Sequence, residues 1–481
     1  MALKIVVLAA YALTIVGVGL AGLRRTSSFQ DFFLGGGQVG PWMTAFTYAT
    51  AYFSAVLFIG FAGKIGWGFG YSGLWIALGN ALIGVLGVWG VLGWRIKRMS
   101  TEYGVSTMAE YFEARYRSRF LKLFAAVCVF VFFIPYTSAV FMGLSYLFRS
   151  NFGIDYGVAL ALMGGFTALY LVLGGYRSMA MIDVVFGMIM LVGVTVLLVF
   201  TLKEGGGLAA IGQGLRDVDP RLTAPVGPPG AWPLFCLVFL TSVAPLGMPQ
   251  LVQKFYAIRD REAVRVGMVA STVFALLIGG TAYFTGAAAR LFLSPETAPA
   301  AFADGRPVFD ALMPELLARV VPESLGVLML LLILSASMST LAALVLIASS
   351  SVVKDLYAGF VNADASDAVL TRSMRLASAG FVLLSVLLAA ARPATIVAIL
   401  GISWGAIGAV FLGPFLWGLF WGRTSRAGAV SGSVLGLAVC LGMYALGRPS
   451  PEAGTVGMLV SLAVVPLVSL GSPAPRPAET A

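Results

Sequence analysis

A cluster of small polar residues lies in the middle of the apolar run 324–352. Ala336, Ser339 and Thr340 occupy positions i, i+3 and i+4, so a helix places them on one face. Two hydroxyls and one carbonyl are hard, neutral ligands that suit a weakly hydrated monovalent cation, whereas Mg²⁺ normally requires carboxylates. The alternative is structural, because Ser and Thr also bond the carbonyl four residues earlier or join neighbouring helices.

Two other apolar runs carry interruptions that could supply the remaining oxygens. Residues 47–54 form a polar, small stretch inside the run 40–63, and Pro245 and Pro249 fall inside the run 232–253. Proline cannot complete the hydrogen bonding of a helix. A broken helix exposes main-chain carbonyls, and these carbonyls opposite the hydroxyl face would form a cage of five oxygens.

Asp183 is the one carboxylate just inside the end of an apolar segment. An ionisable group at membrane depth is a functional candidate by default, and this one could draw a cation toward the inner mouth. The alternative is that Asp183 pairs with Arg177 or caps the helix that follows.

These residues belong to a chain whose composition is that of a membrane protein. Of its 481 residues 59% are apolar and 11% are charged, against roughly a quarter charged in soluble domains. This excludes a soluble enzyme, a disordered protein and a disulfide scaffold. The chain has no His, and its three Cys fall in apolar segments, so we expect no zinc site and no enzyme.

The apolar runs predict an all-α, polytopic membrane protein with about thirteen transmembrane helices, since about 20 apolar residues cross a bilayer. The thirteen runs are 2–21, 40–63, 72–94, 121–148, 156–174, 181–202, 232–253, 265–293, 324–352, 374–391, 394–420, 427–447 and 455–471.

The basic residues predict the orientation of these helices. The net charge of +10 comes from Lys and Arg in short loops, most of them on one side, which marks that side as cytoplasmic. The N-terminus is therefore expected outside and the C-terminus inside the plasma membrane. We interpret the positive charge as setting the orientation of the helices in the membrane, and we expect no nucleic-acid partner.

The order of the runs is typical of an inverted repeat. If the first helix is an extra, runs two to six and seven to eleven form two sets of five. Because five is odd, the second set begins on the opposite side of the membrane from the first and is inverted relative to it. The interruptions then fall in the first member of each set. The predicted units are 1–39 (extra helix and first loop), 40–202 (first repeat), 203–231 (extracellular loop), 232–425 (second repeat), 426–471 (two C-terminal helices) and 472–481 (a disordered tail).

Four segments in order resemble motifs of the sodium:solute symporter family, which includes proline, sugar, pantothenate and monocarboxylate symporters. Residues 33–37 (FLGGG) are similar to its YFLGGR loop, and 110–116 (EYFEARY) to its EFLEARY loop. Residues 174–183 resemble GGxxAVxxTD, with Ile182 where Thr is usual. Residues 335–357, which end in KDLY, resemble its AAxMST…KDLY segment.

The resemblance implies a five-plus-five inverted-repeat, LeuT-like core and Na⁺-driven uptake. It places Na⁺ on the carbonyls of Thr50, Phe53 and Ala336 and on the hydroxyls of Ser339 and Thr340. It also assigns Asp183 to the sodium exit path. Na⁺ is favoured over H⁺ on the residues themselves, because proton coupling needs a titratable group along the path.

The solute is less well determined by the sequence. Tyr52 stands where proline symporters carry an aspartate, which disfavours proline. An uncharged pocket would suit a monocarboxylate, an amino acid or a vitamin-like molecule. An H⁺-coupled transporter, or a non-transporting sensor or channel on the same fold, is the alternative function. The expected partners are this solute, Na⁺ and membrane lipid, and the oligomeric state stays open. The substrate-binding candidates near breaks or the midplane are Tyr52, Ser54, Tyr136, Gln250 and Ser403.

Overall fold

The computed structural model describes residues 2–23, 33–37, 39–173 and 176–473. The basic pair Arg24 and Arg25, the glycines at 174 and 175, and most of the predicted tail 472–481 lie outside these residues.

The described chain is almost entirely helical, as the apolar runs predict. A two-stranded antiparallel hairpin pairs β1 (Phe302–Ala303) with β2 (Arg306–Pro307), with Phe302 opposite Pro307 and Ala303 opposite Arg306. The α-helices are α1 (Ala2–Leu23), α3 (Pro41–Tyr52), α4 (Trp67–Phe69), α5 (Leu74–Gly79), α6 (Trp94–Tyr103), α7 (Met108–Tyr116), α8 (Arg119–Phe152), α9 (Tyr156–Leu173), α10 (Tyr176–Glu204), α11 (Leu208–Val218), α12 (Ala231–Val243), α13 (Pro249–Tyr256), α14 (Arg261–Phe292), α15 (Phe309–Val320), α16 (Gly326–Ser350), α17 (Asp367–Ala391), α18 (Ile396–Phe420), α19 (Arg426–Ala445) and α20 (Ser450–Gly471).

Shorter 3₁₀ and π-helical stretches link or extend these helices. The π-helical stretches are η2 (Val56–Gly66), η4 (Asn80–Gly93) and η9 (Ser351–Val361). The 3₁₀ turns are η1 (Gly35–Gly37), η3 (Gly70–Gly73), η5 (Pro220–Thr223), η6 (Ala244–Gly247), η7 (Pro299–Ala301) and η8 (Glu323–Leu325).

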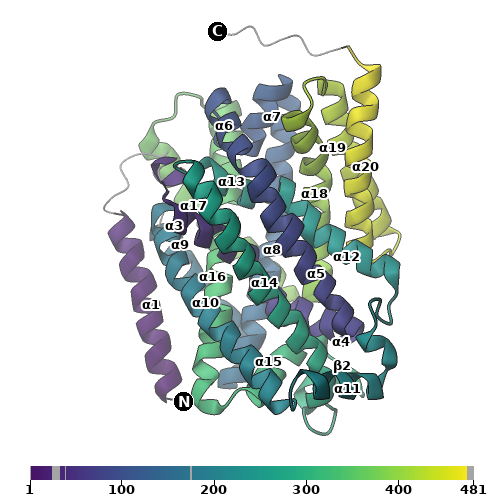
Figure 1. Ribbon diagram of the computed structural model, residues 1–481. Helices are drawn as coiled ribbons and strands as arrows, with labels where there is room; N and C mark the ends of the chain where they lie inside the picture. The colour runs from purple at the N-terminus through teal and green to yellow at the C-terminus, as the bar shows by residue number, and fades with distance from the viewer. Residues whose placement is uncertain (1, 24–32, 38, 174–175, 474–481) are drawn as a thin grey trace.

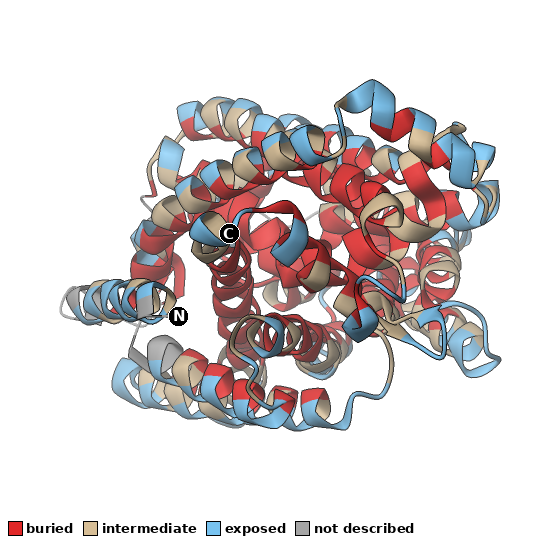
Figure 2. Ribbon diagram, turned by 90° about the horizontal axis from the view of Figure 1, so that it is seen from below, coloured by how far each residue is buried: buried red, intermediate tan, exposed pale blue. Residues whose placement is uncertain are grey.

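The long helices form one bundle with two distinct ends (Figure 1). The end that carries α6 and α7 is called the α7 end, and the opposite end, with α11, α15 and the hairpin, is called the α15 end. The start of α1 lies at the α15 end and the last turn of α20 at the α7 end. Residues are buried toward the middle of the bundle and exposed around it (Figure 2).

The predicted count of about thirteen spans is not confirmed, because eleven helical stretches of the described chain are long and apolar enough to cross a membrane. One of these stretches, Val56–Tyr103, is 48 residues long, turns at Gly70 with a φ of +59°, and contains both the end of the predicted run 40–63 and the run 72–94. Helix α9, at the predicted run 156–174, is 18 residues long and is not one of the eleven.

The first predicted break is present. Helix α3 ends at Tyr52, Phe53 is extended with φ −114° and ψ 123°, and helical structure resumes after Ser54. Because Phe53 is extended, the last carbonyls of α3 receive no hydrogen bonds from N–H groups one turn further along the chain. Those carbonyls therefore need partners from other elements.

The second predicted break is present as well. Helix α12 ends at Val243, η6 follows, and Met248 is extended before α13 begins at Pro249. Proline suits the first helical position, where its missing N–H has no helical partner anyway. Both interruptions therefore lie in the first member of each predicted repeat.

Helices differ sharply in how much of their surface the protein covers. The apolar window of α16 is 94% buried and that of α18 is 89% buried, whereas that of α1 is 17% buried. A helix that is apolar all round and buried is central to a bundle. Helix α1 packs on α9, α10 and α16 from outside, and Figure 2 shows it at the periphery.

Candidate functional site

The polar face of α16 lies directly against the break in α3. The Ser339 hydroxyl donates to the Thr50 hydroxyl across 2.8 Å, and the Thr340 hydroxyl lies 3.3 Å from the Ala51 carbonyl. Ser339, Thr340 and Thr50 are all buried. The sequence-predicted residues on the two helices are thus brought together in the centre of the protein.

A further serine on α16, which sequence reasoning missed, supports the break itself. The Ala55 N–H, just past the break, donates to the Ser337 hydroxyl across 3.2 Å, and the Val56 N–H donates to the Ser54 hydroxyl. Ser337 also donates to the Ile333 carbonyl. The sequence does contain a signal for Ser337, because this residue belongs to the same polar cluster. Its side chain, however, lies on a different side of α16 from that of Ser339.

The donor set at this contact is neutral. Besides the two hydroxyls it includes the Ala336 carbonyl, which accepts from Thr340 across 3.1 Å, and the carbonyls at the end of α3. Within the described residues no group of three or more His, Cys, Asp or Glu could hold a metal ion. Neutral oxygens that face one another across two helices fit a weakly hydrated monovalent cation better than Mg²⁺ or a transition metal.

The structural alternative describes the same contacts. Thr340 bonds the carbonyl four residues earlier, on Ala336, and Ser339 joins α16 to α3 through Thr50. The Na⁺ ligands therefore stay a prediction.

Next to the break lies a small cavity of about 30 Å³. This volume holds a few water molecules at most, so the cavity is too small for an organic solute. The predicted residues Tyr52, Ser54 and Tyr136 line the cavity. The other lining residues are Phe53, Val56, Leu57, Phe61, Asn80, Thr241, Tyr283, Leu400 and Trp404.

The other two substrate-binding candidates lie elsewhere. Gln250 is buried in the first turn of α13 with its amide nitrogen 3.2 Å from the Met248 sulfur, and its amide oxygen has no partner among the described residues. Ser403 lies on α18 and donates to the Phe132 carbonyl. Neither lines the cavity, so their role in binding stays a prediction.

Polar and aromatic groups that sequence reasoning missed complete the lining. The Tyr52 hydroxyl donates to the Thr241 carbonyl across 2.6 Å, and Asn80 lies beside Ser242 at 3.0 Å. The Trp404 ring meets Tyr52 and Tyr136 edge-on. Asn80 could have been predicted from the sequence, because it is the one amide side chain in the apolar run 72–94. Nothing in the sequence distinguishes Trp404 from the other tryptophans.

Asp183 is fully buried, and its two carboxylate oxygens have no hydrogen-bond partner among the described groups. Lys254, on α13, is also fully buried, and its ammonium lies 5.0 Å from the centre of the Tyr176 ring and has no hydrogen-bond partner among the described groups. Asp183 and Lys254 are therefore two buried groups of opposite charge that form no ion pair within 4 Å in the described part of the chain, whereas Arg177 is exposed.

Residues 32–436 match the model of the sodium:solute symporter family. The chain belongs to this family. Two relatives from Escherichia coli (strain K12) are a sodium/pantothenate symporter, 29% identical over 89% of this chain and 88% of its own length, and a sodium/proline symporter, 28% identical over 94% and 91%. The family is sodium-coupled, so Na⁺ is the ion that its members use.

Solved structures place the symporter-family chain in the LeuT-like fold. An outward-open, substrate-bound structure of a Na⁺-coupled sialic acid symporter aligns over 98% of both chains, with a TM-score of 0.82 at 18% identity. A closed structure of a nucleobase-cation-symport-1 family transporter aligns over 90% and 92%, with a TM-score of 0.55 at 13% identity. The expectation of a LeuT-like fold is confirmed.

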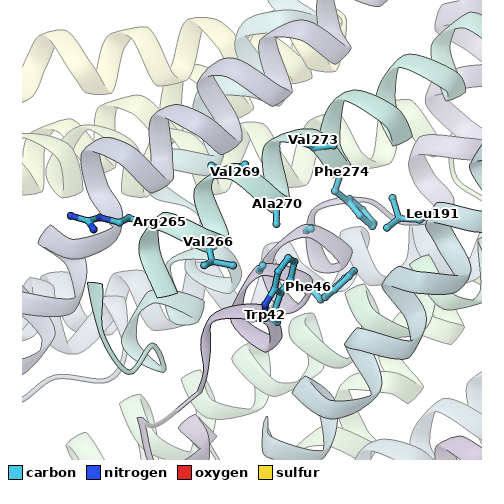
Figure 3. Close-up of a pocket in the computed structure, with 11 residues that line it drawn as sticks. Trp42, Phe46, Leu191, Arg265, Val266, Val269, Ala270, Val273 and Phe274 are labelled. Carbon is cyan, nitrogen blue, oxygen red and sulfur yellow. The ribbon is translucent and has the colours of Figure 1, made fainter. Parts of the chain in front are cut away.

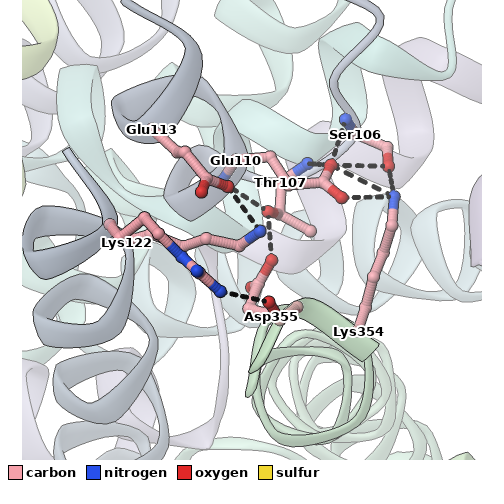
Figure 4. Close-up of polar contacts among 9 residues, drawn as sticks. Ser106, Thr107, Glu110, Glu113, Lys122, Lys354 and Asp355 are labelled. Atoms are coloured by element: carbon pink, nitrogen blue, oxygen red, sulfur yellow. Dashed lines mark hydrogen bonds and ion pairs between the residues drawn. The ribbon is translucent and has the colours of Figure 1, made fainter. Parts of the chain in front are cut away.

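Two of the family motifs meet at the α7 end (Figure 4). Glu110 of α7 forms an ion pair with Lys354 of η9 at 3.0 Å, and Thr107 donates to Asp355 across 2.6 Å. Ser106 contacts both Glu110 and Lys354, and Glu113 pairs with Lys122 at 2.6 Å. These residues are called the α7-end network, and they join positions 244 apart in the sequence.

Local structure explains why Glu110 is in place. Thr107 caps α7 by accepting from the Glu110 N–H, and the Glu110 carboxylate accepts from the Thr107 N–H, which makes a capping box. Burial opposes the ionisation of Glu110, but the Lys354 charge and the Ser106 hydrogen bonds outweigh it and hold the pKa of Glu110 below its ordinary value. The carboxylate is therefore charged at neutral pH.

At the α15 end, Asp310 of the short helix α15 is buried beside the start of α18. One carboxylate oxygen accepts from the Ile396 N–H across 3.2 Å, and the other has no partner among the described groups. Burial raises the pKa of Asp310 to about 6, against the opposing effects of the Ile396 hydrogen bond and the Lys64 charge. This carboxyl links α15 to the helix that carries Trp404.

Proposed function

We propose that this protein is a Na⁺-coupled symporter that imports a small organic solute by alternating access. The observation that carries the proposal is the contact of Ser339 and Thr340 with the break in α3. Few other arrangements place several neutral oxygens at the centre of a bundle of apolar helices. The expected solutes are a monocarboxylate, an amino acid or a vitamin-like molecule.

The proposed Na⁺ ligands are the hydroxyls of Ser339 and Thr340 and the carbonyls of Ala336, Thr50 and Phe53. These residues come from both predicted repeats, 40–202 and 232–425. An ion held there favours the arrangement in which α3 and α16 are in contact. If solute binding favours the same arrangement, each ligand raises the affinity for the other, by linkage.

Asp183 is the proposed exit point for Na⁺. It is a fully buried carboxylate with no hydrogen-bond partner among the described groups, so it can attract an ion that leaves the α3–α16 contact. We propose that the α7 end faces the cytoplasm, which agrees with the basic residues on α6 and α7.

The proposed solute pocket is the small cavity next to the break. Tyr52, Ser54 and Tyr136 are its predicted contacts, and Gln250 and Ser403 would join them only after a rearrangement. The lining carries no charged side chain. A free carboxylate on the solute would therefore have to use hydroxyls, amides and helix ends. The cavity must also enlarge to admit a solute, which fits a transporter that alternates between states.

Uptake into proteoliposomes tests the proposal. A thermal-shift screen of small carboxylates, amino acids and vitamins in Na⁺ or K⁺ first names the solute, because a ligand of the folded state raises the melting temperature. Labelled solute should then accumulate with an inward Na⁺ gradient and not with K⁺. Accumulation driven by a pH gradient alone would indicate H⁺ coupling, unitary currents a channel, and sodium-dependent binding without uptake a sensor.

A further inference from the structure

An apolar groove runs along the outside of the bundle between α3, α10 and α14 (Figure 3). Its volume is about 550 Å³, within the size range of small-molecule binding sites. The side chains that line it are apolar apart from one arginine. They are Trp42, Ala45, Phe46, Ala49, Leu191, Arg265, Val266, Val269, Ala270, Val273 and Phe274.

The polar atoms of the groove lie at its α7 end. Trp42 is in the first turn of α3 and Arg265 is near the start of α14, and both are exposed. The starts of these helices are tied together, because Val39 exchanges main-chain hydrogen bonds with Ala257 and Arg259. Further along, the lining is purely hydrocarbon. This change from polar to apolar matches a molecule with one anionic and one long apolar part.

Arg265 is available for an anion. The neighbouring acid Asp260 pairs with Arg259 at 2.7 Å. Arg261 lies over the Trp94 ring. Within the described part of the chain Arg265 has no ion pair within 4 Å. Trp42 adds an indole N–H of the kind that lies at headgroup level in membranes.

We propose that the groove binds an anionic phospholipid from the leaflet at the α7 end. One acyl chain lies along Val266, Val269 and Val273, and the phosphate is bound by the Arg265 guanidinium and the Trp42 indole. A bilayer supplies this ligand at high local concentration. Anionic lipids of the cytoplasmic leaflet attract basic side chains, with about a five-fold gain in affinity expected from one arginine.

The bound chain would touch the helix that carries the proposed Na⁺ site. Ala45 and Ala49 line the groove, and they lie five residues and one residue before Thr50. The Ser271 hydroxyl donates to the Ala45 carbonyl across 3.0 Å, and the Phe274 ring packs edge-on against Phe46. A lipid that fills the groove therefore stabilises α3 against α14.

Lipid binding to the purified full-length protein tests this inference without using transport. The probes are phosphatidylglycerol and phosphatidylcholine with brominated acyl chains, which quench nearby tryptophans. We expect about a five-fold preference for phosphatidylglycerol, and the part of the quenching that Trp42→Phe removes should show that preference. Arg265→Gln should abolish the preference, and Ala270→Phe should weaken binding of both lipids by filling the groove.

Matched controls separate a site from general lipid contact. Leu276→Phe enlarges an exposed residue of α14 outside the groove, and Arg372→Gln removes an exposed arginine of α17. Both should leave lipid preference unchanged. Equal affinity for the two lipids in the unmodified protein, or quenching that Trp42→Phe does not change, would overturn the inference. If Ala270→Phe fails to fold, Arg265→Gln alone decides.

Discussion

The α3–α16 contact and the α7-end network both join the same helical run to the first half of the chain, but they use opposite chemistry. The first uses hydroxyls and carbonyls, with distances of 2.8 to 3.3 Å. The second uses charges, including the pair of Glu110 and Lys354 at 3.0 Å. Buried charges carry a large desolvation cost, whereas neutral oxygens in hydrogen bonds carry a small one.

This difference fits the position of each contact. A neutral contact can lie in the dry centre of the bundle and still accept a cation, because its oxygens are not already balanced by a positive group. Charges are tolerable at the α7 end, where Glu110 and Lys354 keep about a fifth of their side-chain surface exposed. Helix α16 continues directly into η9, so both contacts lie on one helical run.

The largest expected effect comes from removing the neutral contact. Ser339→Ala combined with Thr340→Ala deletes two oxygen ligands, each of which is worth roughly 1.5–3 kcal/mol when bonded to a charge. We expect the Na⁺ concentration for half-maximal uptake to rise by at least about 100-fold. The measurement is solute uptake against Na⁺ concentration in proteoliposomes.

Ser349→Ala is the matched control, because Ser349 is a buried serine of α16 that bonds Ser378 and lies away from α3. It should leave the Na⁺ dependence unchanged. An unaltered Na⁺ response in the double variant would remove the basis of the proposed site.

A smaller effect is expected from the charged contact. Glu110→Gln leaves Lys354 without its ion-pair partner and should lower the uptake rate roughly ten-fold, a change of about 1.4 kcal/mol in the conformational equilibrium. Lys354→Met removes the same ion pair but leaves the capping box of Glu110 in place, and it should lower the rate to a similar extent. Glu102→Gln is the control, because the pair of Arg98 and Glu102 is exposed. An unchanged rate in Lys354→Met would contradict a role for the ion pair.

A variant in the cavity lining tests whether solute binding and Na⁺ binding depend on different residues. Asn80→Leu removes an amide that lines the cavity and should weaken solute binding about ten-fold, a typical loss for one hydrogen bond. The Na⁺ dependence should change less than two-fold. Titration of the solute in the thermal-shift assay measures the first, and uptake against Na⁺ concentration the second. Equal losses in both would show that Asn80 supports the ion site instead.

The last prediction concerns stability and not transport, and it involves Asp310, a buried carboxyl outside both contacts. Its folded-state pKa of about 6 lies above the ordinary value, so the folded state binds the proton more tightly than the unfolded state. Stability should therefore fall by roughly 2–3 kcal/mol as pH rises from 4 to 6. Asp310→Asn should flatten this part of the profile of melting temperature against pH. The same slope in both proteins would exclude Asp310 as its cause.

Much of the fold follows from local features of the sequence. Length and apolarity alone determine a membrane bundle, and the breaks after Tyr52 and around Pro245 follow from small polar residues and prolines. The turn at Gly70 falls in the gap between the predicted runs 40–63 and 72–94, but the count of about thirteen spans is not confirmed.

The sequence by itself determined that this is a helical membrane protein with interrupted helices, neutral oxygens on one face of α16 and family motifs in order. Only the tertiary structure decided which groups meet: Ser337 with the break, Ser339 with Thr50, and Glu110 with Lys354. The physical reason is that helix formation depends on neighbours a few residues apart. Contacts between helices depend on how each one is rotated, and an evenly apolar helix such as α18 does not reveal which side faces the centre.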